Sequence, residues 1–401
     1  MIRLLTKRRY FEDFLGAYDA QDRSVHVVHE DPSIGATQEL PEERMSRKKS
    51  IENRYNVAIV GATGNAGAAT MRILEERNFP IGNIIAVASE RSVNRTISFG
   101  TRSVKVQSIA GVNWQDVDLA FFCVGGAVSR RYAETVTNDG CVVIDKSSYF
   151  RLNAKVPLII PEVNGNLLQG GAPLGIISTP NCIAVPLIMT LKALSALATL
   201  KKIVVSTYQS VSGAGRLAIN ELYRQSRESI MAIATHHEVF PKQIAFNVIP
   251  LIGYLDESGV SEEEDKISSE VCKILKKNLL VSVTCVRVPV FIGHSMSVVC
   301  EFSSPVAIDA IFESFENASG IVVIDRRGEH SSFATPLDTA GEDSVFVSRI
   351  RTHPSSQNLL LYWISCDNLR KGAALNSVQI AESLLSIDPS LNGFKKSASI
   401  P

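Results

Sequence analysis

One cysteine stands where cysteine chemistry is favoured. Cys182 follows Thr179-Pro180-Asn181 and precedes an apolar stretch, 183–197, that we expect to be a helix. Pro186 falls in the first turn of that helix, where a missing N–H costs little. Because a helix N-terminus or a nearby imidazolium lowers a thiol pKa from about 8.5, Cys182 is our candidate thiolate nucleophile. The other six cysteines fit the core, and an inert buried thiol is the alternative for any single cysteine.

Two further segments carry groups that could assist such a thiol. Gln209 ends an expected strand, 202–209, and is followed by the small-residue loop 210–215, so its amide can approach a ligand. His294 follows a glycine and is the candidate general base, although a lone histidine is more often structural. Arg287, on the strand leading to His294, either binds a carboxylate bidentately or pairs with an acid of the core.

A glycine-rich turn predicts a dinucleotide site. Gly61, Gly64 and Gly67 follow the apolar strand 56–60 and precede a helix that we expect to run to about residue 78. Glycines allow close backbone approach, and a helix N-terminus holds a pyrophosphate. A tight strand-to-helix turn without a ligand is the alternative. The second strand is followed by Arg91 and Ser92 and not by a clear ribose-binding acid, which favours NADP over NAD, although Glu90 argues the other way.

The elements that must position these groups form two patterns. Strands 56–60, 84–89, 118–124 and 141–145 alternate with helical stretches, which is typical of a doubly wound, Rossmann-type parallel sheet. After about Pro180 the strands arrive with fewer helices, so we expect an α+β catalytic and dimerisation domain with a mixed or antiparallel sheet. The predicted division is a cofactor domain of 54–180 completed by a C-terminal helix, 366–388, a catalytic domain of 181–365 and a tail of 389–401.

Composition excludes several classes of protein. The 401 residues are 45% hydrophobic and 20% charged, with 41 basic and 41 acidic side chains. This balance fits a globular enzyme and lacks the basic excess of a nucleic-acid or membrane-surface binder. No apolar run reaches the length of a membrane span. The seven cysteines are widely spaced, which argues against a disulfide framework or a metal site and favours a reducing cytoplasm.

Residues 1–53 differ from the rest of the chain. They mix basic clusters with acids and show no sustained period, so we expect a poorly ordered leader without chemistry. A transit peptide or secretory signal is disfavoured, because the segment contains acids and has no apolar core. Met45 is the alternative translation start, which N-terminal sequencing of native protein would test.

Six segments in combination resemble the aspartate-semialdehyde dehydrogenase family from about Tyr55 to Ile387. They are Gly61-Ala-Thr-Gly-Asn-Ala-Gly67, Arg91-Ser92, Asn181-Cys182, Tyr208-Gln-Ser-Val-Ser-Gly-Ala-Gly215, Arg287-Val-Pro-Val-Phe-Ile-Gly-His-Ser295 and Asp367-Asn-Leu-Arg-Lys-Gly-Ala-Ala374. The resemblance implies NADPH-dependent reductive dephosphorylation of aspartyl phosphate to aspartate semialdehyde, in the pathway to lysine, threonine and methionine. It also implies a homodimer.

The resemblance implies a role for each matching residue. Cys182 would form the acyl-thioester, Gln209 would orient it, and His294 would be the acid/base. The substrate and phosphate would be bound by Arg287, Arg151, Lys266 and Glu263. The cofactor would be bound by Gly61, Thr63, Gly64, Asn65, Ala66, Gly67, Arg91, Ser92, Ser212, Gly213 and Asn368.

Two positions depart from the family pattern. Lys146 replaces an asparagine that normally helps at the phosphate site, so we expect phosphate binding to survive or to tighten. Val93-Asn94 replaces the small residues that usually follow Arg-Ser.

Three other functions remain open on the residues alone. N-acetyl-gamma-glutamyl-phosphate reductase shares the covalent chemistry, but Asn181-Cys182 and Gln209 argue against it. A catalytically silent dinucleotide-binding protein would be expected to lose Cys182 or His294. A cysteine hydrolase would not require the glycine-rich half.

Overall fold

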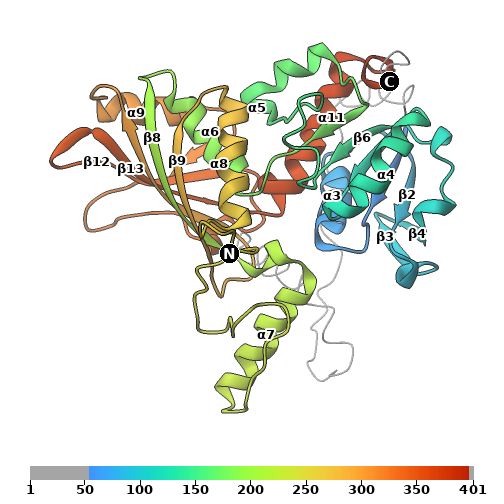
Figure 1. The fold of residues 1–401 in the computed structure, drawn as a ribbon, viewed down its shortest axis with the longest axis horizontal. Coiled ribbons are helices and arrows are strands. Elements are labelled where there is room, and N and C mark those ends of the chain that lie inside the picture. The colour runs from blue at the N-terminus through green and yellow to red at the C-terminus, as the bar shows by residue number, and fades with distance from the viewer. Residues whose placement is uncertain (1–53, 397–401) are drawn as a thin grey trace, which may run out of the picture. The chain divides into compact units, whose positions relative to one another are not determined.

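Two β-sheets, each with its own helices, make up the described part of the chain (Figure 1). The structure is a computed structural model that describes residues 54–396. The expected leader, 1–53, lies outside this range. Among the described residues, no helix is long and apolar enough to cross a membrane.

The first sheet has seven strands in the order β3-β4-β2-β1-β5-β6-β7. All neighbours are parallel except β3 and β4, and the central strand β1 is a buried apolar run. The strands are β1 Tyr55–Val60, β2 Ile81–Val87, β3 Thr96–Phe99, β4 Arg102–Gln107, β5 Leu119–Phe122, β6 Val142–Asp145 and β7 Ile176–Ser178. The predicted doubly wound sheet is confirmed, since parallel neighbours require crossovers and helices supply them.

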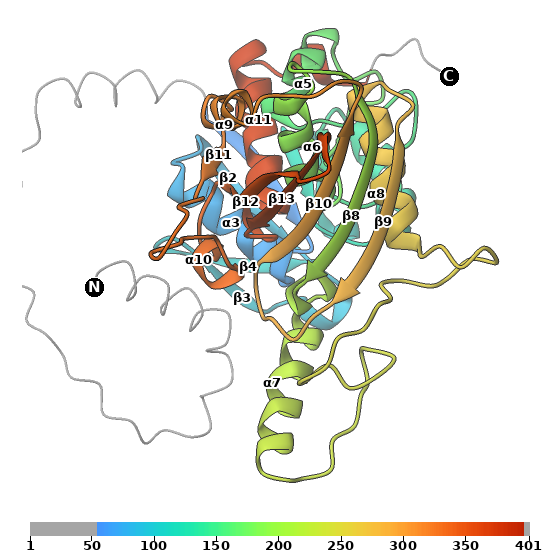
Figure 2. The same cartoon turned by 90° about the vertical axis from the view of Figure 1, so that its left-hand side faces the viewer.

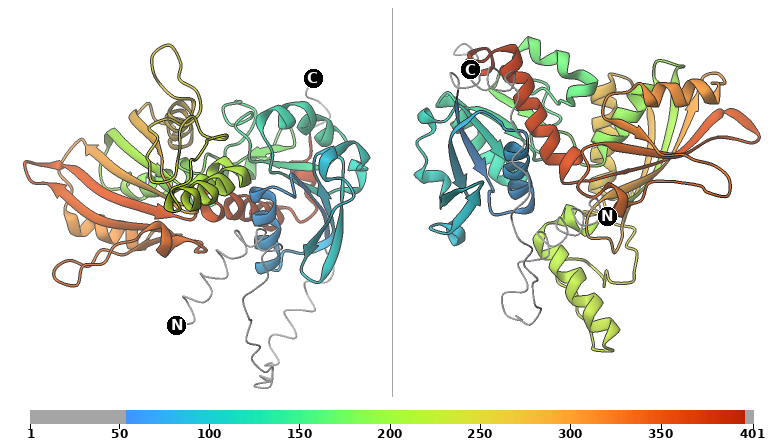
Figure 3. Two further views of the ribbon diagram at one scale, coloured as in Figure 1. Left: turned by 90° about the horizontal axis from the view of Figure 1, so that it is seen from below. Right: turned by 180° about the vertical axis from the view of Figure 1, so that it is seen from behind.

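The helices of the first sheet come from the segments between its strands and from the C-terminal end of the described chain. Those within it are α3 Asn65–Glu76, α4 Gly126–Asn138, α5 Pro161–Asn164 and the short 3₁₀ helices η1 Glu90–Ser92, η2 Ile109–Gly111, η3 Trp114–Asp116 and η4 Gly165–Gly170. The π-helix η6 Arg370–Ala374, the helix α11 Leu375–Ile387 and η7 Asn392–Phe394 come from the C-terminal end. Viewed from behind, α11 runs between the two sheets (Figure 3), and it packs against α3, α5 and β6 of the first.

The second sheet is mixed and has the order β11-β12-β13-β10-β8-β9. Its outer pairs, β11 with β12 and β8 with β9, are parallel, and the inner pairs are antiparallel. The strands are β8 Leu200–Gln209, β9 Leu280–Arg287, β10 His294–Phe302, β11 Ile321–Val323, β12 Val345–His353 and β13 Ser356–Cys366. The expectation of a mixed or antiparallel second sheet is therefore also confirmed.

One face of the second sheet carries the largest core of the described chain. The helices α6 Ala184–Leu194, α8 Glu262–Leu275 and α9 Ile308–Glu316 pack on it through buried aliphatic side chains (Figure 2). On the other face, Val204 and Tyr208 of β8 are more than one-third exposed. The remaining elements are η5 Val211–Ala214, α7 Arg216–Ile230, which projects away from both sheets, and α10 Pro336–Thr339.

Candidate active site

A cavity of about 310 Å³ brings together groups from both halves of the chain. Cys182 lies at its wall, two residues before the start of α6, as the apolar pattern predicted. Nine of the residues singled out from the sequence line this cavity: Ala66, Lys146, Arg151, Asn181, Cys182, Gln209, Gly213, Glu263 and Arg287. The loop end of the second sheet therefore meets the glycine-rich turn of the first sheet at this cavity.

The Cys182 thiol is less acidic in this structure than its helix position suggested. Burial and, to a smaller extent, the carboxylate of Glu263 raise the pKa of Cys182 to about 12. Arg287 and Arg151 act in the opposite direction without compensating for these effects. The expectation of a lowered pKa is therefore wrong, because burial outweighs the helix N-terminus and the two guanidinium groups.

The residue before the nucleophile is held by two acids of α8. The backbone N–H of Asn181 donates to Glu270 Oε2 at 2.6 Å, and its side-chain amide donates to Glu263 Oε1 at 2.9 Å. Asn181 Oδ1 accepts the backbone N–H of Ile183 at 2.8 Å. Asn181 thereby fixes the turn that leads from the loop into α6, and Cys182 takes its orientation from that turn.

Glu270 also binds the arginine expected to bind phosphate. Its Oε1 accepts from Arg151 Nη1 at 2.9 Å, and both side chains are buried. Burial raises the pKa of Glu270, whereas Arg151 and the Asn181 N–H lower it. Arg151 Nε is buried without a hydrogen-bond partner among the described residues. The pair leaves Arg151 with an unused donor, which is what an anion-binding arginine requires.

Sequence reasoning missed Glu270, although its position contained a signal. The apolar residues Ile267, Val271 and Ile274 define the buried face of α8, and Glu270 falls on that face. A carboxylate on a buried helical face needs a cation or several donors. That requirement predicts a partner of this kind without identifying Arg151.

Lys266 lies outside the cavity at Cys182, whereas Lys146 lines it. Lys266 forms an ion pair with Glu262 on its own helix and is not among the residues that line the cavity. The Lys146 ammonium donates to Thr70 Oγ1 of α3 at 3.0 Å, and burial lowers its pKa. Only the backbone oxygen of Lys146 contacts Arg151. Lys146 thus lines the same cavity as Arg151 while its ammonium binds Thr70 of α3, and its effect on phosphate binding stays a prediction.

Gln209 and Arg287 are neighbours in the register of β8 and β9. Arg287 is buried, and its Nη1 donates to the Ser210 carbonyl at 2.7 Å. Burial lowers the pKa of Arg287, and the neighbouring Cys182 and Glu263 raise it. Gln209 Nε2 donates to Thr207 Oγ1 at 3.3 Å. Both side chains are thus held at the strand ends where they border the cavity.

His294 is fully buried behind the loop that follows Gln209. Burial and the charge of Arg287 hold the pKa of His294 well below its usual value, so the imidazole is neutral. Its Nδ1 accepts the Ser210 backbone N–H at 3.0 Å, which assigns the proton to Nε2. Nε2 has no partner among the described residues, and a Cβ placed at Gly213 would be 3.3 Å from it.

Ser212 and Asn368 hold this loop in place. Asn368 Oδ1 accepts from Ser210 Oγ at 3.2 Å, from Ser212 Oγ at 3.1 Å and from the Gly293 N–H at 2.9 Å. Both residues are buried, whereas Gly213 and Ala214 of the loop are exposed. A direct contact of either residue with a cofactor stays a prediction.

The glycine-rich turn fits a dinucleotide. Gly61 has φ +91°, and a Cβ there would lie 2.4 Å from the Cys123 carbonyl oxygen, while a Cβ at Gly67 would lie 2.2 Å from the Gly61 oxygen. The turn ends at Gly64, the N-cap of α3, so the first N–H groups of the helix are free to bind an anion. Asn65 Nδ2 is buried without a partner among the described residues. Arg91 and Ser92 lie in η1, after β2, as expected.

Comparisons with known proteins agree with this architecture. Residues 56–170 match the family model "Semialdehyde dehydrogenase, NAD binding domain", and residues 191–371 match "Semialdehyde dehydrogenase, dimerisation domain". The first match shows a nicotinamide dinucleotide-binding domain. The first match spans strands β1 to β6 of the first sheet, and the second match spans all six strands of the second sheet.

The chain is similar to curated proteins and to a solved structure that are aspartate-semialdehyde dehydrogenases. The aspartate-semialdehyde dehydrogenase of Rickettsia bellii is 48% identical over 335 residues, 84% of this chain and 99% of the relative. That of Aquifex aeolicus is 41% identical over 334 residues, 82% of this chain and 98% of the relative. The crystal structure of aspartate semialdehyde dehydrogenase II of Vibrio cholerae, complexed with ASA, has a TM-score of 0.81 at 37% identity and covers 84% of this chain and 99% of that one. The chain belongs to the aspartate-semialdehyde dehydrogenase family.

Proposed function

We propose that this enzyme reduces L-4-aspartyl phosphate to aspartate 4-semialdehyde with NADPH, through a thioester on Cys182. The observation that carries the proposal is the single cavity lined by Cys182, Gln209, Arg151 and Arg287 beside the glycine-rich turn. The nucleophile, two cations for the two anionic ends of the substrate, and the cofactor turn meet there.

Cys182 attacks the acyl carbon, and phosphate leaves. Arg151, with its unused Nε, receives the phosphate, and Arg287 holds the α-carboxylate. Since burial opposes ionisation of the thiol, the proton leaves Cys182 during the attack rather than before it and departs with the phosphate as hydrogen phosphate. Gln209 orients the thioester from the end of β8.

The bound nicotinamide dinucleotide supplies the hydride that converts the thioester to the aldehyde. His294 presents its Nε2–H beside Gly213, where a hydrogen bond stabilises the oxygen that becomes negative when the hydride arrives. This oxygen then forms the aldehyde carbonyl while the C–S bond breaks, and His294 gives its proton to the departing Cys182 sulfur and regains one from solvent. We assign His294 the acid half of the predicted acid/base role, because its tautomer carries the proton on the free nitrogen.

We propose NADP as the preferred cofactor on Arg91 and Ser92 in η1, which follow β2 at the position of the ribose hydroxyls. We also propose a homodimer built on the uncovered face of the second sheet, where Val204 and Tyr208 are exposed. The division of labour is cofactor binding by 54–180 with 366–388, and catalysis and dimerisation by 181–365.

The test is reduction of NADP by aspartate semialdehyde, which runs the reaction backwards. Activity should require inorganic phosphate, should disappear in Cys182→Ser, and should be weaker with NAD. The unreactive variant must still bind NADP, which shows that it is folded. A folded wild-type enzyme that binds NADP but shows no activity would contradict the proposal.

A further inference from the structure

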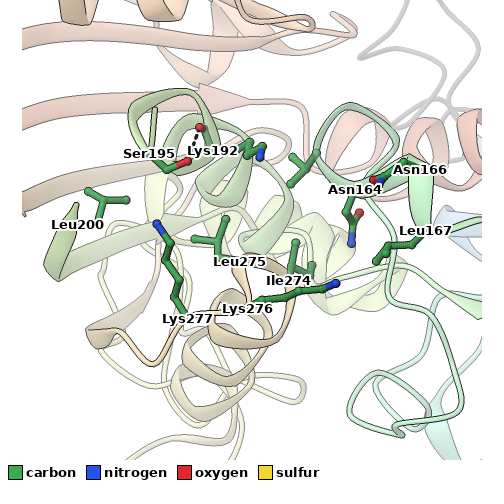
Figure 4. A pocket seen from close by; sticks show the side chains of 11 residues that line it. Asn164, Asn166, Leu167, Lys192, Ser195, Leu200, Ile274, Leu275, Lys276 and Lys277 are labelled. Atoms are coloured by element: carbon green, nitrogen blue, oxygen red, sulfur yellow. Dashed lines mark hydrogen bonds between the residues drawn. The ribbon is translucent and has the colours of Figure 1, made fainter. Parts of the chain in front are cut away.

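A second cavity, of about 290 Å³, lies at the C-terminal ends of α6 and α8 (Figure 4). It shares no lining residue with the cavity at Cys182. Leu167 of η4, Leu200 of β8, and Ile274 and Leu275 of α8 supply apolar walls. Its volume is at the lower end of the range for ligand pockets, about 300–1,000 Å³, so it suits a small molecule.

The polar part of this cavity is positively charged. Lys192, Lys276 and Lys277 line it, and no aspartate or glutamate does. Figure 4 shows Lys192 on one side and Lys276 and Lys277 on the other, with Ile274 and Leu275 between them. No ion pair found within residues 54–396 involves any of the three lysines. An anion with an apolar body would bind the lysines through its charged group and contact the leucine and isoleucine side chains through its apolar part.

Helix capping explains only part of this charge. Lys192 is in the last turn of α6, where a cation is favoured by the helix dipole. The last turn of α8 already contains Lys273, whose ammonium binds backbone carbonyls of residues 151–156. Lys276 and Lys277 come after that turn and add two further cations.

Lys276 also has a backbone conformation that favours glycine. Its φ is 52° and its ψ is 40°, at the position that ends α8. Glycine is the usual residue there because a side chain is disfavoured in the left-handed region. Residues in sparsely populated backbone regions gather at ligand-binding sites. Here that conformation places a lysine on the wall of the cavity.

The cavity is connected to the nucleophile through buried contacts. Val163, a lining residue, follows Glu162, whose carboxylate accepts from Lys371 Nζ at 2.8 and 2.7 Å. Lys371 is only 1% exposed, and the next residue, Gly372, lies against Cys182. A Cβ on Gly372 would be 3.0 Å from the Cys182 carbonyl oxygen and 3.2 Å from its Cβ. A displacement of α5 therefore reaches the backbone that supports Cys182.

We propose that this cavity binds a small organic anion with an apolar body, and that the bound anion changes the reactivity of Cys182 through the Glu162–Lys371 contact. The anionic group is a carboxylate or a phosphate monoester, both of which lysine ammonium groups bind. The site lies outside the catalytic cavity, so binding there does not require the substrate.

Calorimetric titration tests the binding. The probes are hexanoate and hexyl phosphate. Hexanol is the control for the apolar tail alone, and inorganic phosphate is the control for the head group alone. The organic probes are titrated in saturating inorganic phosphate, which occupies the phosphate site proposed in the catalytic cavity. The two probes identify which head group is preferred. Lys276→Glu/Lys277→Glu should weaken the preferred probe at least about tenfold. Lys105→Glu/Lys242→Glu, which reverses two exposed lysines elsewhere, should leave it unchanged.

Two results would overturn the binding site. One is equal affinity of the preferred probe for the wild type and for Lys276→Glu/Lys277→Glu. The other is that neither probe binds the folded wild-type enzyme. Either outcome leaves the proposed reaction unaffected, because no turnover is measured.

The coupling is tested by alkylation of Cys182 with iodoacetamide, followed by mass spectrometry of the Cys182 peptide. The bound probe should change the alkylation rate by about fivefold or more in the wild type. Glu162→Gln, which removes the charge that holds Lys371, should bind the probe but lose most of this effect. An alkylation rate that does not respond to saturating probe would overturn the coupling.

Discussion

Gly213 lies directly against the imidazole of His294. A methyl group at position 213 would come 3.3 Å from His294 Nε2 and 3.1 Å from Arg287 Nη1. Gly213→Ala should therefore displace His294, the proposed acid, together with Arg287, the arginine proposed to bind the carboxylate, and lower kcat by about tenfold to a hundredfold. Steady-state kinetics check this, with Gly170→Ala as the control because a methyl group there meets nothing within 4 Å. Equal losses in the two variants would contradict the role of the contact.

Glu263 should suppress the ionisation of Cys182. Its carboxylate raises the pKa of the thiol, so Glu263→Gln should lower that pKa and increase the thiolate fraction at neutral pH. We expect iodoacetamide to alkylate Cys182 about threefold to tenfold faster in the variant. Glu262→Gln, one residue away on the same helix, should leave the rate unchanged. A rate that does not increase in Glu263→Gln would show that burial alone sets the pKa.

The stability of the fold should depend on pH through His294. The pKa of His294 is about 6.5 when the chain is unfolded and lies well below this value in the folded protein. The unfolded chain therefore binds the extra proton first, so the contribution to stability is complete above about pH 6.5 and is lost as the pH falls. Between about pH 7.5 and 5.5 the loss is about 1.4 kcal/mol.

Urea unfolding at both pH values measures this loss. His294→Asn should remove it, whereas His353→Asn, at an exposed position, should retain it. The same pH dependence in His294→Asn and in the wild type would exclude His294 as its source.

Removal of Glu270 should destabilise the protein. Glu270→Ala leaves Arg151 buried without its carboxylate and the Asn181 N–H without its acceptor, at a cost of about 3–5 kcal/mol in the free energy of unfolding. Arg151→Met/Glu270→Leu should recover much of the loss, since no charge is then buried alone. Urea unfolding measures both, and Glu257→Ala at an exposed position is the control. A double variant no more stable than Glu270→Ala would contradict this account.

Arg91 should determine the preference between the two cofactors. Arg91→Ala should weaken NADP binding about tenfold or more and change NAD binding less than about twofold, since only NADP carries the 2′-phosphate. Fluorescence titration with each cofactor measures this, with Arg95→Ala as the neighbouring control. An equal loss for NADP and NAD would argue against a contact with the 2′-phosphate.

The sequence predicted the fold well because each signal was local. The strand 56–60 differs from the observed β1 by one residue, whereas α3 begins at Asn65, before Gly67, and so starts about three residues earlier than expected. The position of Cys182 before a helix followed from Pro186 and the apolar run. The acidity of Cys182 did not follow, because it depends on burial and on Glu263, which is about 80 residues away in the chain.

Partners across the fold were the part that could not be predicted. The contacts of Glu270 with Arg151 and Asn181 join residues about 119 and 89 positions apart. Lys146 lines the cavity with Arg151, and the partner of its ammonium, Thr70, is 76 positions earlier and had no signal in the sequence. The spacing of residues along the chain identifies the groups that are available for chemistry. Which of these groups form hydrogen bonds or ion pairs with one another depends on the tertiary structure.

The return of α11 to the first sheet has a consequence for biosynthesis. Leu375, Val378 and Leu384 of α11 are buried, and η6 and α11 pack against α3. During translation the glycine-rich turn and its strands leave the ribosome before the second sheet, and the helix that completes their packing emerges only after it. The cofactor-binding half therefore cannot finish packing until the second sheet has been synthesised.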